Sequence, residues 1–185
     1  SRFLVARDYL PHTALSLRID SGLNRFGEGL SFVWFVLLAV IVCNVTLRYA
    51  FSQGRIELEE LQWHLYSIGF LLGMSYAYQA DAHIRVDVLH ENFRHSTKAW
   101  IELYGIILLL LPFIALILVF SVRFVESSWA VAEISMSPGG LPLRWLIKAA
   151  LPVGFSLLLL SALSRLLRVW YFLFLQPQVE VVDAD

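Results

Sequence analysis

Four long, mainly apolar stretches constrain the fold of this chain more than any other feature. They cover approximately residues 30–50, 61–80, 99–122 and 146–172 of the 185-residue sequence, in which 58% of residues are hydrophobic and 16% are charged. A helix of about 20 apolar residues crosses the hydrocarbon layer of a bilayer, and its backbone groups then pair within the helix. The sequence therefore predicts an all-α fold, an integral membrane four-helix bundle over residues 30–175.

Prolines and arginines modify the third and fourth stretches. Pro112 and Pro152 fall inside them and predict kinks. Arg165 and Arg168 interrupt the fourth stretch near one end. We expect the apolar stems of both arginines to lie along the helix, with the guanidinium groups reaching the membrane–water interface.

The distribution of basic residues predicts the orientation in the membrane. With the N-terminus in the cytoplasm, nine lysines and arginines lie on the cytoplasmic side and five lie outside. Cytoplasmic loops of membrane proteins carry such an excess of basic residues. We therefore expect both termini to be cytoplasmic, with residues 176–185 forming a cytoplasmic tail.

Residues 1–29 form a predicted cytoplasmic N-terminal segment. Within it, Leu15, Ile19, Leu23 and Phe26 recur at spacings that place them on one face of a helix. This pattern favours an amphipathic helix that lies along the membrane surface and leads into the first span. A cytosolic helix packed on the loops is the alternative.

Asn44 and Arg48 are four residues apart near the outer end of the first predicted span. Arg48 could bind an anion there. The nearby acidic residues Glu57, Glu59 and Glu60 favour a structural ion pair instead, because a charge at this depth needs a partner.

Glu60 and His64 are also four residues apart, which could supply two metal ligands. A catalytic zinc usually has three protein ligands, and no third histidine or cysteine occurs at that depth. A helix cap or a subunit contact is the favoured interpretation. The single cysteine, Cys43, excludes a cysteine-based metal site. We expect no metal, no cofactor and no nucleic-acid partner.

Two further features concern packing. Gly69 and Gly73 form a small-residue face on the second predicted span, which lets another helix approach closely. Between the second and third spans, His83, Arg85 and Asp87 alternate with apolar residues. This alternation favours an ordered loop that binds a partner or the chain's own bundle.

No nucleophile in a recognisable motif accompanies the loop histidine, His83, so we expect no catalytic residues and no enzyme activity.

The chain resembles the small membrane subunit of tripartite ATP-independent periplasmic (TRAP) transporters, the DctQ-like family. The resemblance depends on Asn44 and Arg48 in the first span and Glu60 at the start of the second. It depends also on AHIRVDVL at residues 82–89 and on SPGGLPLRWLIKAALPVGFSLLLL at residues 137–160. It implies a small scaffold subunit that supports a large multi-span membrane subunit in the bacterial inner membrane. That pair would take up an organic acid by sodium-coupled symport after a periplasmic binding protein delivers it.

The resemblance also implies roles for individual residues. By matching position, it assigns an interface or loop-ordering role to Asn44, Arg48, Glu60, His83, Arg85 and Asp87. The expected partner interface comprises these residues together with Gly69 and Gly73 of the small-residue face. Arg144, Trp145 and Lys148 could touch the binding protein or simply anchor the chain at the interface with membrane lipids. The alternative function is a haem-binding four-helix membrane cytochrome subunit. It is not favoured, because His64 is the one histidine within a predicted span and the others cluster on the cytoplasmic side.

Overall fold

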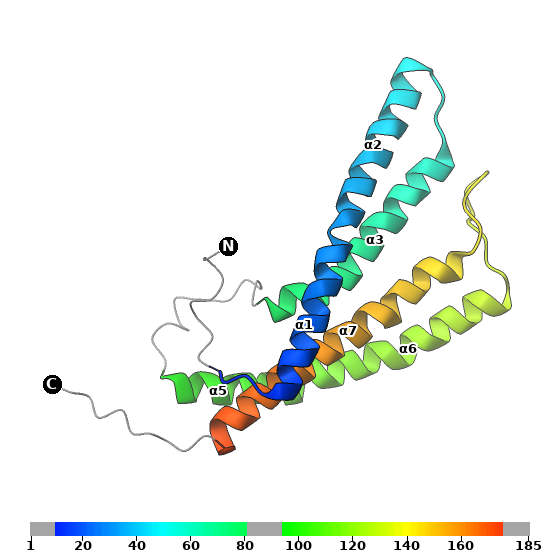
Figure 1. The fold of residues 1–185 in the computed structure, drawn as a ribbon. Helices are drawn as coiled ribbons and strands as arrows, with labels where there is room; N and C mark the ends of the chain where they lie inside the picture. The colour runs from blue at the N-terminus through cyan, green and yellow to red at the C-terminus, as the bar shows by residue number, and fades with distance from the viewer. Residues whose placement is uncertain (1–9, 81–93, 176–185) are drawn as a thin grey trace.

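A computed structural model describes residues 10–80 and 94–175 of the chain, and these residues form helices without strands (Figure 1). The elements in chain order are α1 (Ala14–Leu30), α2 (Phe32–Ala50), α3 (Ile56–Gln79), α5 (His95–Tyr104), the π-helical segment η1 (Gly105–Leu110), α6 (Leu111–Ala130), α7 (Arg144–Trp170) and the π-helical segment η2 (Tyr171–Leu175). The all-α prediction is therefore confirmed for the described residues.

Three continuous helical runs are long and apolar enough to cross a membrane: Ala14–Ala50, His95–Ala130 and Arg144–Leu175. With membrane-capable helices of this kind, the chain is an integral membrane protein. Helix α3 has 24 residues, and at about 1.5 Å per residue it has the length of a span. It lacks an equally apolar window among the described residues. A membrane crossing by α3, and with it the four-span bundle, stays a prediction.

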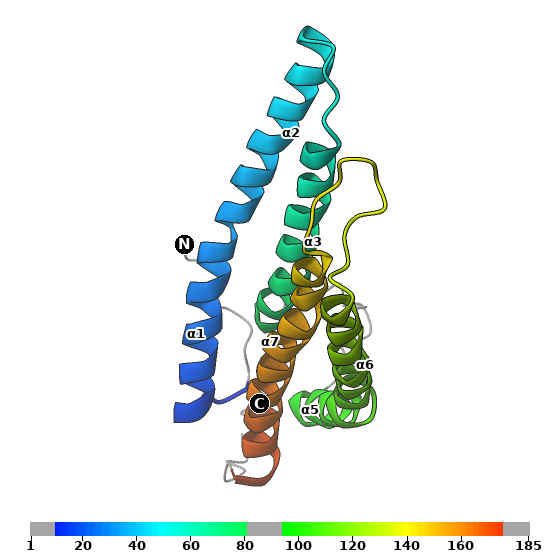
Figure 2. The ribbon, with the colours of Figure 1, turned by 90° about the vertical axis from the view of Figure 1, so that its right-hand side faces the viewer.

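Helix α1 occupies the residues predicted for the N-terminal helix and runs on into α2. Thr13 and Ser16 form a capping box at its start, with the Ser16 amide donating to Thr13 Oγ1 at 3.2 Å. Ser31 separates α1 from α2, and its hydroxyl donates to the Gly27 carbonyl at 3.0 Å. Both views show the two helices following one direction (Figures 1 and 2). The placement of α1 along a membrane surface is not tested and stays a prediction.

The buried face of α1 differs from the predicted apolar face. Leu15 and Phe26 are exposed, and of the four predicted residues only Leu23 is buried. The buried residues are Ser16, Asp20, Leu23, Gly27 and Leu30. Helix α1 packs with this mixed polar and apolar face against α3 and α7. The polar side chains can be buried because Asp20 accepts a hydrogen bond from Ser164 of α7 and Ser16 donates one to the Thr13 carbonyl in the helix cap.

The third membrane-capable run contains a wider helical turn. Segment η1 ends two residues before Pro112. Proline lacks an amide hydrogen, and its ring collides with the carbonyl four residues earlier, so a π-helical turn before it relieves the conflict. The helix then continues to Ala130, beyond the predicted end at residue 122.

Helix α7 is the centre of the fold. It contacts α1, α3, α5 and α6, and it lies between α1 and α6 in the view of Figure 2. One apolar core cluster consists of Ile114, Phe155, Leu158 and Ala162. A second, smaller cluster of Leu10, Ala99, Leu103 and Val169 lies where the N-terminal residues, α5 and the end of α7 meet.

Glycines set the closest helix approaches. A Cβ atom added to Gly154 on α7 would lie 2.6 Å from the Leu71 carbonyl oxygen of α3, so only glycine fits this backbone contact. On α3, a Cβ at Gly69 would lie 3.1 Å from the Trp34 ring, and one at Gly73 would meet Leu30 at an ordinary 3.8 Å. The predicted packing role of the α3 glycines is thus seen for Gly69, and it is made within this chain.

Candidate interaction surface at the loop end

The end of the bundle formed by residues 51–55 and 131–143, here the loop end, carries the first group of predicted site residues. Arg48 forms an ion pair with Glu59, which confirms the structural pairing expected from the sequence. Asn44 is 5% exposed, and its Oδ1 atom has no hydrogen-bond partner within the described part of the chain. The Arg48–Glu59 pair joins α2 to α3.

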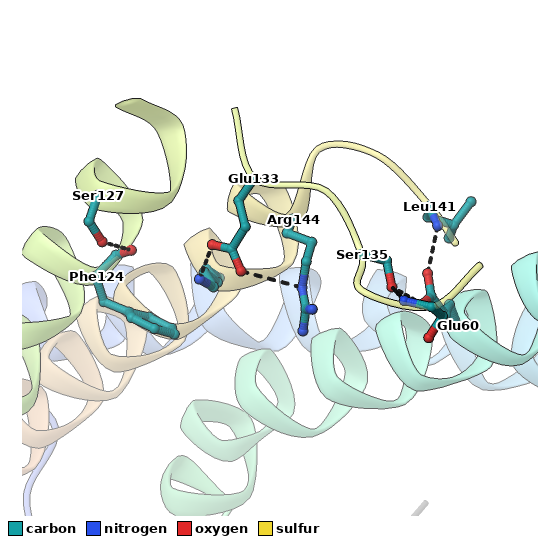
Figure 3. Close-up of polar contacts among 9 residues, drawn as sticks. Glu60, Phe124, Ser127, Glu133, Ser135, Leu141 and Arg144 are labelled. Carbon is teal, nitrogen blue, oxygen red and sulfur yellow. Dashed lines mark hydrogen bonds and ion pairs between the residues drawn. The ribbon is translucent and has the colours of Figure 1, made fainter. Parts of the chain in front are cut away.

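Glu60 anchors the loop between α6 and α7 to α3. Its carboxylate accepts hydrogen bonds from the Ser135 hydroxyl and from the Leu141 amide, the latter at 2.6 Å (Figure 3). Both donors stabilise the ionised form of the carboxylate. Glu60, predicted as a partner contact, therefore holds the chain's own loop.

The loop itself contains a tight turn at this anchor. Gly139 has a φ of 79°, and the Gly140 amide donates to the Ser137 carbonyl at 2.9 Å. A Cβ at Gly140 would lie 2.5 Å from the Ser135 Cβ and 2.8 Å from Glu60 Oε1. The SPGG sequence thus lets the loop close over the Glu60 carboxylate.

Glu133 provides a second anchor at the other side of the loop. It pairs with Lys148, and its Oε1 lies 3.7 Å from Arg144 Nε (Figure 3). The hydrogen bond from Lys148 is the main reason that the pKa of Glu133 lies below its usual value. Lys148 also lies 4.2 Å from the centre of the Phe124 ring, a cation–π contact.

The three predicted binding-protein contacts are therefore unequally accessible. The Lys148 side chain is 15% exposed and engaged with Glu133, whereas the Arg144 side chain is 40% exposed. Trp145 packs edge-on against Trp129, with ring centres 4.4 Å apart. Of the three, Arg144 is the residue with a charge open to solvent.

His64 lines an open groove of about 430 Å³ at the loop end, between α3 and the start of α7. Its Nδ1 lies 2.6 Å from the Glu60 carbonyl oxygen, so this ring nitrogen is used within the helix. The described residues contain no group of three histidine, cysteine or acidic side chains that could hold a metal ion.

Buried polar contacts at the opposite end of the bundle correct the prediction for the α7 arginines. Arg165 Nε lies 2.5 Å from Glu102 Oε1, with the two side chains 9% and 12% exposed. Arg168 Nη2 donates to the Leu10 carbonyl at 3.1 Å. Both arginines are buried rather than extended to the membrane–water interface, because acceptors from α5 and the N-terminal residues reach them.

Asp20 completes this end, and sequence reasoning missed it. Ser164 donates to its Oδ1 at 2.7 Å, and Gln79 donates to its backbone carbonyl at 3.0 Å. The sequence did contain a signal for it: Asp20 lies three residues before Leu23 and therefore on the same face of α1. Asp20 and Glu102 together join α1, α3, α5 and α7.

The sequence matches a known protein family. The pattern that defines the DctQ component of tripartite ATP-independent periplasmic transporters matches residues 37–171, most of the chain. The chain belongs to the DctQ family. No curated protein matches it. It is thus the small membrane subunit of a TRAP transporter, as its resemblance implied.

The DctQ match covers α3, α5, α6 and α7 and begins within α2. The loop at residues 131–143 with its two carboxylate anchors lies inside the matched region, whereas α1 precedes it. The predicted partner residues His83, Arg85 and Asp87 lie outside the described residues, so their roles in this DctQ chain stay predictions.

Proposed function

We propose that this DctQ-family chain is a static scaffold subunit of a TRAP transporter in the bacterial inner membrane, with both termini in the cytoplasm. It supports the large multi-span subunit in sodium-coupled uptake of an organic acid that a periplasmic binding protein delivers. The family match over residues 37–171 is the observation that carries the proposal.

The placement of charge supports a static role. Arg48 with Glu59 and Arg165 with Glu102 are paired within the chain, near opposite ends of the helices. Between these ends, the core cluster around Ile114 is apolar. A substrate or ion path needs accessible polar groups at mid-depth, so we assign transport to the large subunit.

Helix α3 is proposed as the second of four spans and as the helix that meets the large subunit. Its outer face exposes Trp63, Tyr66 and Phe70, and the Tyr66 and Phe70 rings stack with centres 6.4 Å apart. The Tyr66 hydroxyl and Trp63 indole have hydrogen-bonding groups that lipid tails cannot satisfy. We propose that a helix of the large subunit packs on this face, which fits a helix lacking the apolar window of the other long helices.

Purification and reconstitution test the scaffold role. We expect the chain, extracted from membranes in mild detergent, to bring a larger multi-span partner with it. Proteoliposomes that contain both subunits should take up the organic acid only with sodium and the binding protein, and the chain alone should show no uptake. Uptake by this chain alone, or its purification without such a partner, contradicts the proposal.

Two exposed phenylalanines form a matched pair for the α3 interface. Phe70 on α3 is 59% exposed and Phe35 on α2 is 69% exposed. Phe70→Ala should lower recovery of the large subunit, because packing drives helix association in lipid. Phe35→Ala should leave recovery unchanged. Equal recovery with both variants would place the interface elsewhere.

A further inference from the structure

The continuous run of α1 and α2 packs against α3 along one face of each (Figure 1). The contacts that mark this face are, in order towards the loop end, Gly27 with Tyr76, Leu30 with Gly73, Trp34 with Gly69 and Tyr66, and Arg48 with Glu59. Residue numbers rise on one helix as they fall on the other, so the two helices are antiparallel and in one register. On α3 the contacting residues recur at helical spacing and therefore lie on one face.

Asn44 and Gln62 lie at the level between the last two of these contacts. Gln62 follows Glu59 by three residues and precedes Tyr66 by four, so it belongs to the same face of α3. Asn44 is 5% exposed, and α3 is the main helix against which α2 packs. The antiparallel register therefore turns the two amide side chains toward each other, inside the contact between the helices.

Each of these amides has one buried atom without a hydrogen-bond partner among the described residues. The atoms are Asn44 Oδ1 and Gln62 Nε2, which are complementary because the first accepts and the second donates. An unpaired amide atom in an apolar interior costs free energy, and lipid tails offer nothing to satisfy it. A side chain from another subunit would have to part the two helices to reach Asn44 Oδ1. A water molecule is small enough to fit between them.

We propose that one buried water molecule bridges Asn44 and Gln62. It accepts a hydrogen bond from Gln62 Nε2 and donates one to Asn44 Oδ1. Its second hydrogen goes to a helix carbonyl, which has a further lone pair, and the total matches the three bonds of an ordinary buried water. The bridge fixes the register of α2 on α3, as polar groups do between membrane helices. Asn44 then acts within this chain rather than at the partner interface expected from the sequence.

A double-mutant cycle on the whole chain in detergent tests the coupling between the two amides. Asn44→Leu and Gln62→Met remove the amides with little change in volume. Either variant alone leaves the opposite amide unsatisfied and should lower Tm by about 2–12 °C. The double variant has no amide left to satisfy, so its Tm should return to within about 2 °C of the wild type. If the two single shifts simply add, the amides are not coupled and the proposal is wrong.

Gln79 provides the matched control, because it is the same residue type on the same helix. It lies at the other end of α3, where its Nε2 donates to the Asp20 carbonyl at 3.0 Å. Asn44→Leu combined with Gln79→Met should therefore give the sum of the two single shifts in Tm. Recovery of Tm in this combination as well would trace the recovery to the added apolar side chains and overturn the proposal.

An electron cryo-microscopy map that resolves ordered water tests the bridge directly and needs no variant to fold. The chain is purified from membranes with whatever subunits accompany it, so this result does not depend on the transporter function proposed above. We expect a density peak at about 3 Å from both Asn44 Oδ1 and Gln62 Nε2. A direct hydrogen bond between the two amides, or one from Asn44 to a residue of another subunit, overturns the proposal.

Discussion

Replacing Gly154 by alanine adds a methyl group where α7 meets the backbone of α3. The new Cβ would lie 2.6 Å from the Leu71 carbonyl oxygen and 2.9 Å from its carbonyl carbon. Neither atom can rotate away, so the helices must separate locally, and such overpacking costs about 1–3 kcal/mol. Alanine also favours a helix over glycine by up to about 1 kcal/mol, which offsets part of this cost.

A second glycine removes the helix-propensity effect from the measurement. Gly22 lies inside α1, and a Cβ added there meets nothing within 4 Å. Gly22→Ala should therefore gain the helix preference alone, and the two variants should differ by about 1–3 kcal/mol. At roughly 2–4 °C per kcal/mol, the difference in Tm lies between about 2 and 12 °C. Thermal unfolding in detergent, followed by tryptophan fluorescence, measures it.

A third variant tests the cause. Leu71→Ala shortens the side chain but keeps its carbonyl group and Cβ, which are the atoms that the new methyl group meets. Because Leu71→Ala leaves those atoms in place, it should restore little of the stability that Gly154→Ala loses. Recovery of stability in the double variant, or a Tm for Gly154→Ala equal to that of Gly22→Ala, would refute the backbone-contact argument.

Two further predictions concern the charged groups at the two ends. Glu102→Gln removes the charge that Arg165 faces. Because the pair is buried, the free energy of unfolding should fall by about 3 kcal/mol, which thermal or denaturant unfolding measures. A fall below about 1 kcal/mol, the value typical of an exposed pair, contradicts this prediction. The lowered pKa of Glu133 favours folding above the ordinary value of 4.5, and this contribution is lost as the pH falls through the lowered pKa. Between pH 7 and pH 3, Tm should therefore fall less for Glu133→Gln than for the wild type, and parallel curves would exclude the role of Glu133.

Local sequence patterns predicted the helices better than their ends. The predicted first span at residues 30–50 matches the extent of α2 closely, because residues 32–43 form an uninterrupted apolar run. Helix α3 instead begins at Ile56, before the predicted residue 61. The acidic residues Glu57 and Glu59 were taken as lying outside the helix, yet acidic side chains in a first turn interact favourably with the helix dipole.

Contacts of the candidate site were predictable where the two residues lie close to the same turn between helices. Arg48 and Glu59 lie near the turn that joins α2 to α3, so their pairing followed from sequence proximity and from the cost of an unpaired charge. Arg165 and Glu102 are far apart in the sequence, and no periodicity indicates that α5 brings a carboxylate to α7. The same limit hid the Glu60 anchor, whose partners Ser135 and Leu141 belong to a loop.

The internal ion pairs also determine which surfaces remain for partners. Four ion pairs use charged side chains within the chain, and the exposed faces of its long helices are mainly apolar and aromatic. In lipid such side chains gain nothing from leaving their surroundings, so the α3 face around Phe70 can select the large subunit only through shape and the hydrogen-bonding groups of Trp63 and Tyr66.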